Sequence, residues 1–209
     1  VGSFVNVLID RTMVGEDFVH GRSHCDKCKK TLAWFDLVPV VSYVLYRGKS
    51  RCCKTPLPLR YPIVEILVGI LFVWWLAVGF WFFQLVNAPL IVIQPLFWLL
   101  TGIVLAILAL ADLYYGVILM NVIWFGVCLT VGYRLILWRY QAFQIMDLIN
   151  SLIVAGTLYV FFWLLHKMTR GRGMAEGDMY VALYMGLLLG WPRGVVAILP
   201  RFILGALIS

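Results

Sequence analysis

Charged residues are scarce in this chain of 209 residues, since Asp, Glu, Lys and Arg together make up only 13% of it. Soluble domains carry about 25% charged residues and are close to half apolar. This chain is 63% hydrophobic, with a mean hydropathy of +0.95. Several of its apolar runs approach the roughly 20 residues that a helix needs to cross a bilayer. The composition therefore excludes a soluble globular domain and predicts an all-α, polytopic integral membrane bundle.

The sequence also lacks an internal repeat, a low-complexity tract and a GxGxxG segment following a strand. Without that glycine pattern, a Rossmann-type nucleotide site is not expected. Secondary transporters often contain inverted repeats and place their acidic residues near mid-span. The missing repeat therefore counts against a transporter, although a transporter or scaffold with a metal-stabilised loop stays open as an alternative.

The apolar runs divide the chain into three parts. Residues 1–9 are expected to end a first transmembrane helix, residues 10–61 to form a polar loop with cysteines, and residues 62–209 to form the transmembrane bundle. Five full spans are predicted near residues 62–83, 96–111, 119–137, 147–165 and 179–199, the last broken by Pro192. The chain opens without methionine and stops inside an apolar run, so we expect a fragment with truncated first and last helices.

Positive charge is concentrated at one end, because ten of the 17 Lys and Arg lie between Arg11 and Arg60. Such a patch can bind nucleic acid, but basic loops of membrane proteins stay in the cytoplasm, and we expect no nucleic-acid partner. With this loop cytosolic, the connections after the second and fourth full spans are cytosolic too. Arg134 and Arg139 then fall on the outer side, against the rule.

Two aspartates, Asp112 and Asp178, lie at helix ends on the same predicted cytosolic side. Two carboxylates that approach closely share a proton, so that one can activate water while the other donates to a carbonyl. This is the chemistry of an aspartyl protease. The alternative is helix capping, which would suit Asp178 before a helix but not Asp112 after one, where the dipole is unfavourable. Intramembrane acids also serve transport.

Four of the five cysteines lie in the polar loop. Cys25 and Cys28 have the CxxC spacing with which two thiolates bind one tetrahedral zinc ion. Cys52 and Cys53 are adjacent, and adjacent side chains chelate one metal less readily, so His24 or His20 is an alternative fourth ligand. A metal-free loop with ordinary thiols is the other possibility. A structural zinc is predicted, because a loop this small buries little surface of its own.

Several segments together resemble the type IV prepilin peptidases. EGDMYVALYMGLLLGW is similar to the GxGD segment of that family, and ADLYYGVIL to its other aspartate motif. GSFVNVLIDR, CDKC, LVPVVSYVLYRGK and LRYPIVEIL occur upstream in the family's order. The resemblance implies a multi-pass enzyme of the bacterial inner membrane that cleaves prepilin or pseudopilin leaders on the cytosolic side. It also implies that Asp112 and Asp178 are the catalytic pair.

The resemblance implies further residue roles. Family members commonly methylate the new N-terminus with S-adenosylmethionine, and Glu65 and Asn6 are candidate contacts for the methyl donor or the substrate. Gly177 is expected to support the turn at the second aspartate. The first glycine of GxGD is Ala175 here, a substitution that costs activity if the position needs positive φ. The proline usual after the first aspartate is Leu119.

The cysteine loop departs from the family as well. Ser50 stands where the third cysteine is expected, Cys53 matches the fourth, and Cys52 is an additional neighbour. The predicted metal ligands are therefore Cys25, Cys28 and Cys53, with Cys52 as a possible fourth. Because of the missing third cysteine, a peptidase without methyltransferase activity is an alternative.

Overall fold

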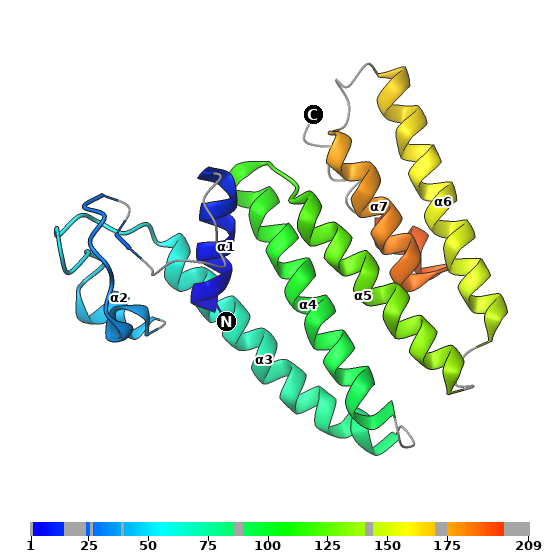
Figure 1. The fold of residues 1–209 in the computed structure, drawn as a ribbon, viewed down its shortest axis with the longest axis horizontal. Helices are drawn as coiled ribbons and strands as arrows, with labels where there is room; N and C mark the ends of the chain where they lie inside the picture. Colours follow the sequence, from blue (N-terminus) through cyan, green and yellow to red (C-terminus); the bar gives the residue numbers. More distant parts are fainter. Residues whose placement is uncertain are drawn as a thin grey trace. The chain divides into compact units, whose positions relative to one another are not determined.

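A computed structural model describes residues 2–14, 24–25, 27–38, 40–85, 90–140, 144–169 and 175–198 (Figure 1). The chain divides into two compact units, residues 1–110 and residues 111–209. The elements are α1 (Gly2–Val14), η1 (Trp34–Leu37), α2 (Val41–Leu45), α3 (Arg60–Leu85), α4 (Leu90–Tyr115), α5 (Met120–Arg139), α6 (Ile145–Met168) and α7 (Glu176–Leu189). The described ranges contain no strand, only two isolated bridges. The all-α prediction is confirmed.

Four helices are long and apolar enough to cross a bilayer: Arg60–Gly79 within α3, and α4, α5 and α6 over their full lengths. Large apolar side chains such as Val73, Trp74 and Leu152 are exposed on them. A helix that is apolar on all sides suits a membrane, where lipid takes the place of a protein core. The predicted polytopic membrane bundle is confirmed in these four helices.

In the first unit, polar side chains join α1 to the start of α3. The amide of Asn6, which is buried, donates to the carbonyl oxygen of Tyr61 at 3.2 Å. The carboxylate of Asp10 accepts from the Tyr61 hydroxyl at 3.0 Å and lies 3.1 Å from the Arg60 guanidinium. These contacts hold α1 beside the first turn of α3.

In the second unit, α7 packs against both α5 and α6. Gly186 allows the closest approach, because a Cβ there would lie 2.7 Å from the Cα of Ala155 on α6. On the α5 side, the ring of Tyr184 fills the space above Gly126. The apolar core between α6 and α7 includes Leu158 and Met179. Small residues therefore set the position of α7 between its neighbours.

The predicted fifth span differs from the structure. α7 ends at Leu189, Gly190 turns the chain with φ 64°, and residues 193–198 are helical again after Pro192. A helix of 14 residues is about 21 Å long, too short for a hydrocarbon core of about 30 Å. Four, not five, continuous spans are present in the described part of the chain.

The early end of α7 leaves backbone carbonyls that need donors inside the membrane. The guanidinium of Arg134 on α5 donates to the carbonyl oxygens of Leu187 at 2.8 Å and Leu188 at 3.3 Å. In a continuing helix, Leu188 would accept from residue 192, but proline has no N–H. Arg134 is buried, so this cation acts as a donor at a helix end and not as a solvated loop residue; the side of the membrane on which it lies stays a prediction.

Replacing Arg134 with methionine is expected to lower the thermal unfolding temperature of the detergent-solubilised protein. The substitution keeps apolar volume but leaves two buried carbonyls without these donors, at about 1–3 kcal/mol each. Arg139→Met is the matched control, because Arg139 is an exposed residue of the same helix. Equal melting temperatures for the two variants would contradict this role of Arg134.

Candidate functional site

Asp112 lies in the last turn of α4, not after the helix as the sequence predicted. The helix ends at Tyr115, where the N–H of Gly116 donates to the Asp112 carbonyl at 2.8 Å and Gly116 takes φ 62°. The Asp112 side chain is partly exposed. The C-terminal end of a helix dipole disfavours negative charge, so capping does not account for this carboxylate.

Asp178 lies in the first turn of α7 and is not its N-cap. The N-cap is Ala175, whose carbonyl accepts from the N–H of Asp178 at 3.1 Å. The N-cap alternative for Asp178 is therefore wrong, although its charge suits this end of the helix dipole. The side chain is partly exposed, with Oδ1 buried.

The two aspartate segments meet within the second unit. A Cβ on Gly177 would lie 2.6 Å from Cδ1 and 2.7 Å from Cβ of Ile118. Gly177 directly precedes Asp178, and Ile118 lies in the turn that follows Asp112. Two spanning helices, α5 and α6, separate the segments in sequence, an even number, so both acids belong to the same end of this unit.

The two residues that differ from the family motif, Ala175 and Leu119, have backbone conformations that suit them. Ala175 has φ −73° and ψ 149°, an extended conformation that alanine adopts without strain. Leu119, the N-cap of α5, has φ −79°, close to the value that a proline fixes. Gly177 is helical, and what it contributes is space for Ile118.

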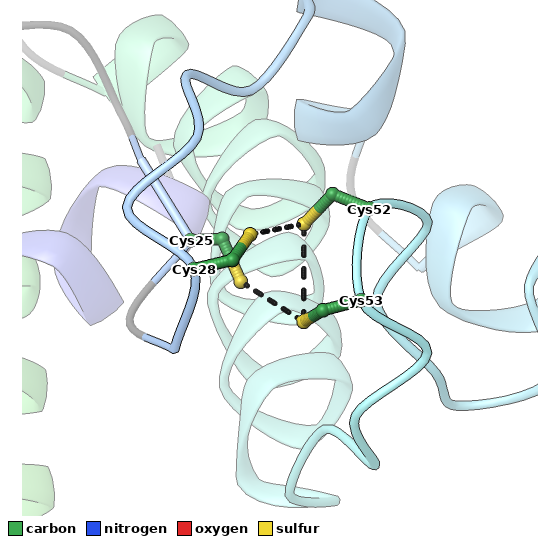
Figure 2. Close-up of side chains that lie close together, drawn as sticks. All are labelled: Cys25, Cys28, Cys52 and Cys53. Carbon is green, nitrogen blue, oxygen red and sulfur yellow. Dashed lines mark hydrogen bonds between the residues drawn. The ribbon is translucent and has the colours of Figure 1, made fainter.

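The loop cysteines converge on one point (Figure 2). The sulfur atoms of Cys25, Cys28, Cys52 and Cys53 all lie within 4.8 Å of one another. Cys25 and Cys53 are 3.7 Å apart, Cys52 and Cys53 3.9 Å, and Cys28 and Cys52 3.0 Å. Four sulfurs around one tetrahedral zinc would be about 3.8 Å apart, given a Zn–S distance of about 2.3 Å. The cluster could therefore hold a metal ion.

Each pair of cysteines lies on a tight turn. In the first turn, the N–H of Cys25 donates to the Lys30 carbonyl at 2.9 Å, and that of Lys29 to the Cys25 carbonyl at 2.8 Å. Lys29 takes φ 54°, the left-handed conformation that closes the turn. Cys28 is carried inside this turn, on the same side as Cys25 (Figure 2).

The second turn repeats these contacts. The N–H of Ser50 donates to the Thr55 carbonyl at 2.8 Å, that of Lys54 donates to the Ser50 carbonyl at 2.8 Å, and Lys54 takes φ 55°. Ser50 thus occupies in the second turn the place that Cys25 has in the first, and Cys53 the place of Cys28. The equivalence follows from the backbone alone and agrees with the family spacing.

Cys52 supplies the fourth sulfur of the cluster. It is not one of the residues that match Cys25 and Cys28 in the comparison of the two turns. Its sulfur lies 3.1 Å from the Ser50 hydroxyl, and that hydroxyl lies 3.5 Å from the Cys25 sulfur. The adjacent cysteines point to the same centre, which the sequence did not favour. His24 interacts with Lys29 at 3.4 Å and is not in the cluster, while His20 falls outside the described residues.

The thiols differ in acidity. Hydrogen bonds, first from the Cys28 backbone N–H and then from the Ser50 hydroxyl, lower the pKa of Cys25 to about 6. Its hydrogen bond with Cys52 raises the pKa of Cys28 to about 11. The lowered pKa of Cys25 favours its thiolate form, while the raised pKa of Cys28 favours the protonated thiol. Metal binding to thiols releases such protons.

Glu65 and Asn6 both have structural partners in the first unit. Oε2 of Glu65 on α3 accepts from the backbone N–H of Val40 at 2.7 Å. Asn6 is engaged with the Tyr61 carbonyl, as described above. These contacts tie α1 and the segment before α2 to α3. A role for either residue toward a methyl donor or substrate stays a prediction.

Both parts of the chain match models of known protein families. Residues 1–79 match the family model described as the bacterial peptidase A24 N-terminal domain, and residues 98–209 match the type IV leader peptidase family. No solved structure matches the chain.

Curated relatives carry the name prepilin leader peptidase/N-methyltransferase. The protein from Myxococcus xanthus is 29% identical over 203 residues, covering 95% of this chain and 56% of the relative. That from Burkholderia pseudomallei K96243 is 30% identical over 198 residues, covering 90% of this chain and 57% of the relative. The protein from Pseudomonas aeruginosa is 28% identical over 238 aligned positions, covering the whole chain and 76% of the relative.

The chain thus spans little more than half the length of the first two relatives. The leader peptidase match alone covers more than half of the 209 residues and includes Asp112 and Asp178. On this evidence, the chain belongs to the type IV leader peptidase family.

Proposed function

We propose that this chain is a membrane aspartyl endopeptidase that cleaves the leader of type IV prepilins or pseudopilins at the cytosolic face of the bacterial inner membrane. The observation that carries the proposal is the apposition of Gly177 with Ile118, which brings together the segments of Asp178 and Asp112. Family membership supports a peptidase, and the apposition supports these two carboxylates as its catalytic pair.

The helix ends give the two carboxylates different roles. Asp178, at the positive end of the α7 dipole, is proposed as the ionised base that takes a proton from water. Asp112, at the negative end of the α4 dipole, is proposed as the acid that donates to the scissile carbonyl oxygen. The water oxygen bonds to the carbonyl carbon. When the C–N bond breaks, the leaving amine takes the proton from Asp178, and Asp112 regains its proton from a hydroxyl of the intermediate as the carbonyl re-forms.

The position of the pair suits a prepilin substrate. A prepilin is an apolar helix behind a basic leader, so it can lie in the bilayer beside the exposed apolar faces of α5 and α6. Its leader junction then reaches the level of Asp112 and Asp178. Both side chains are partly exposed, so the water that hydrolysis consumes has access to them.

We further propose that the cysteine cluster holds a structural zinc ion. Cys25, Cys28, Cys52 and Cys53 match the thiolate set of closed zinc sites. When bound, the ion would cross-link the two turns. These turns bury little apolar surface of their own, since three of the four cysteines are exposed. Metal binding would then contribute directly to the folding of the loop.

N-methylation of the new N-terminus with S-adenosylmethionine is a second proposed activity. It rests on the names of the curated relatives. Glu65 and Asn6 are the proposed contacts, although each also has a structural partner. Peptidase activity alone is the competing possibility, because Ser50 replaces a family cysteine.

Replacing either aspartate with asparagine is expected to reduce prepilin cleavage by a factor of about 10² to 10⁴ or more, the range for loss of an acid or base. Purified protein is incubated with a prepilin peptide, and the leader product is measured by mass spectrometry. Asp147→Asn is the control, because Asp147 is exposed in the first turn of α6. Full cleavage by Asp112→Asn would contradict the dyad, and no cleavage by the unchanged protein would favour a transporter or scaffold.

Replacing Cys52 with serine is expected to reduce bound zinc severalfold, because only three thiols remain. The double variant Ser50→Cys, Cys52→Ser should restore it, since Ser50 occupies the place equivalent to Cys25. Zinc per chain is measured by elemental analysis after purification. Cys128→Ser, in the α5 span, should leave the zinc content unchanged. Full zinc content in Cys52→Ser would show that Cys52 is not a ligand.

Cleaved pilin is expected to gain the mass of one methyl group when S-adenosylmethionine is present. Glu65→Gln should reduce this gain while leaving the extent of cleavage close to that of the unchanged protein. Both products are read from one mass spectrum, with S-adenosylhomocysteine in place of the donor as control. Cleavage without any mass gain would leave a peptidase-only enzyme.

A further inference from the structure

The short helix α2 carries an apolar face that nothing within the described residues covers. Val41, Val44 and Leu45 are 52%, 66% and 71% exposed. Their spacing of i, i+3 and i+4 puts them on one side of the helix. Contiguous apolar surface of this kind marks a contact with a partner or a membrane.

The other side of α2 is occupied by its own subdomain. The hydroxyl of Tyr43 donates to the Leu57 carbonyl at 3.2 Å, and its ring lies against Gly48, where a Cβ would be 2.9 Å from the hydroxyl oxygen. Tyr43 therefore anchors α2 to the segment that holds the second cysteine turn. The apolar face points away from that segment.

A hydrogen bond sets the level of α2 along the membrane helix. The Val40 N–H, at the N-cap of α2, donates to Glu65 Oε2 at 2.7 Å. Glu65 lies five residues into the span Arg60–Gly79, about 7.5 Å along the helix. Val40 takes φ 59°, a conformation that costs a β-branched residue energy and persists only when its surroundings fix it. The hydrogen bond therefore puts the start of α2 beside the first turns of the span, and the end of a span is where an interfacial helix lies.

The charge of the following segment fits an anionic lipid surface. Residues 41–59 contain no Asp or Glu and include Arg47, Lys49, Arg51 and Lys54. Arg47, Lys49 and Lys54 are exposed. Basic residues beside a membrane are attracted to anionic headgroups by about 1 kcal/mol each, and their apolar stems can lie along the lipid.

We propose that α2 lies in the membrane–water interface, with Val41, Val44 and Leu45 in contact with the acyl chains of an anionic bilayer and the basic residues at the headgroups. The cysteine turns are then held at the membrane surface at three points: the start of α3, the Glu65 contact and α2. This inference rests on the geometry of the first unit and does not depend on peptidase activity.

The test places a fluorescent dansyl amino acid at position 44, and separately at position 45, in the full chain reconstituted into phosphatidylglycerol–phosphatidylcholine vesicles. Lipids with dibrominated acyl chains should quench both positions severalfold more than they quench position 54. Iodide in the water should quench position 54 more strongly. Position 70 on α3, where Ile70 is 58% exposed within the span, is the positive control for lipid contact.

Two results would overturn the proposal. Iodide quenching at position 44 equal to that at position 54 would place α2 in water. Protection of positions 44 and 45 from both quenchers, with position 70 still quenched by brominated lipid, would show that a protein segment or a second copy of the chain covers the face.

Discussion

The structure depends on one constraint: inside a bilayer, each backbone or charged group must find its partner within the protein. Long apolar helices meet this constraint by their own hydrogen bonds. α7 does not, because it ends after 14 residues in the middle of a helical bundle. The guanidinium of Arg134 provides the donors that the chain itself lacks at that point, and α7 can be short without leaving Leu187 and Leu188 unsatisfied.

A short α7 has a consequence for the candidate site. Its first turn carries Asp178, and its position is set by close packing at Gly186 and Gly177 rather than by the length of a full span. The same small residues that bring α7 to α6 and to the turn after α4 thus bring the two acidic segments together. Carboxylates at helix ends stay accessible to water, which the proposed hydrolysis needs, while the surrounding helices remain apolar.

The loop between α1 and α3 solves a different problem. It is small, and two matched turns bring its thiols to one centre, where a bound metal ion would cross-link them. The Glu65 carboxylate fixes the start of α2 to α3, so the loop is attached to the membrane part by more than its two chain ends. A cross-linked loop held at this level would present a stable surface beside the bilayer.

The sequence by itself determined the membrane class, four of the spans, the two acidic segments and the CxxC pair, because composition and local spacing carry that information. Tertiary structure alone decided how the end of α7 at Gly190 and Pro192 is satisfied, since the donor comes from α5, 53 residues away from Leu187. It also decided that Cys52 joins the cluster despite its neighbour Cys53, because the direction of a side chain in a tight turn depends on how the whole turn is folded. Neither the donor to the α7 carbonyls nor the direction of the Cys52 side chain can be read from the local sequence.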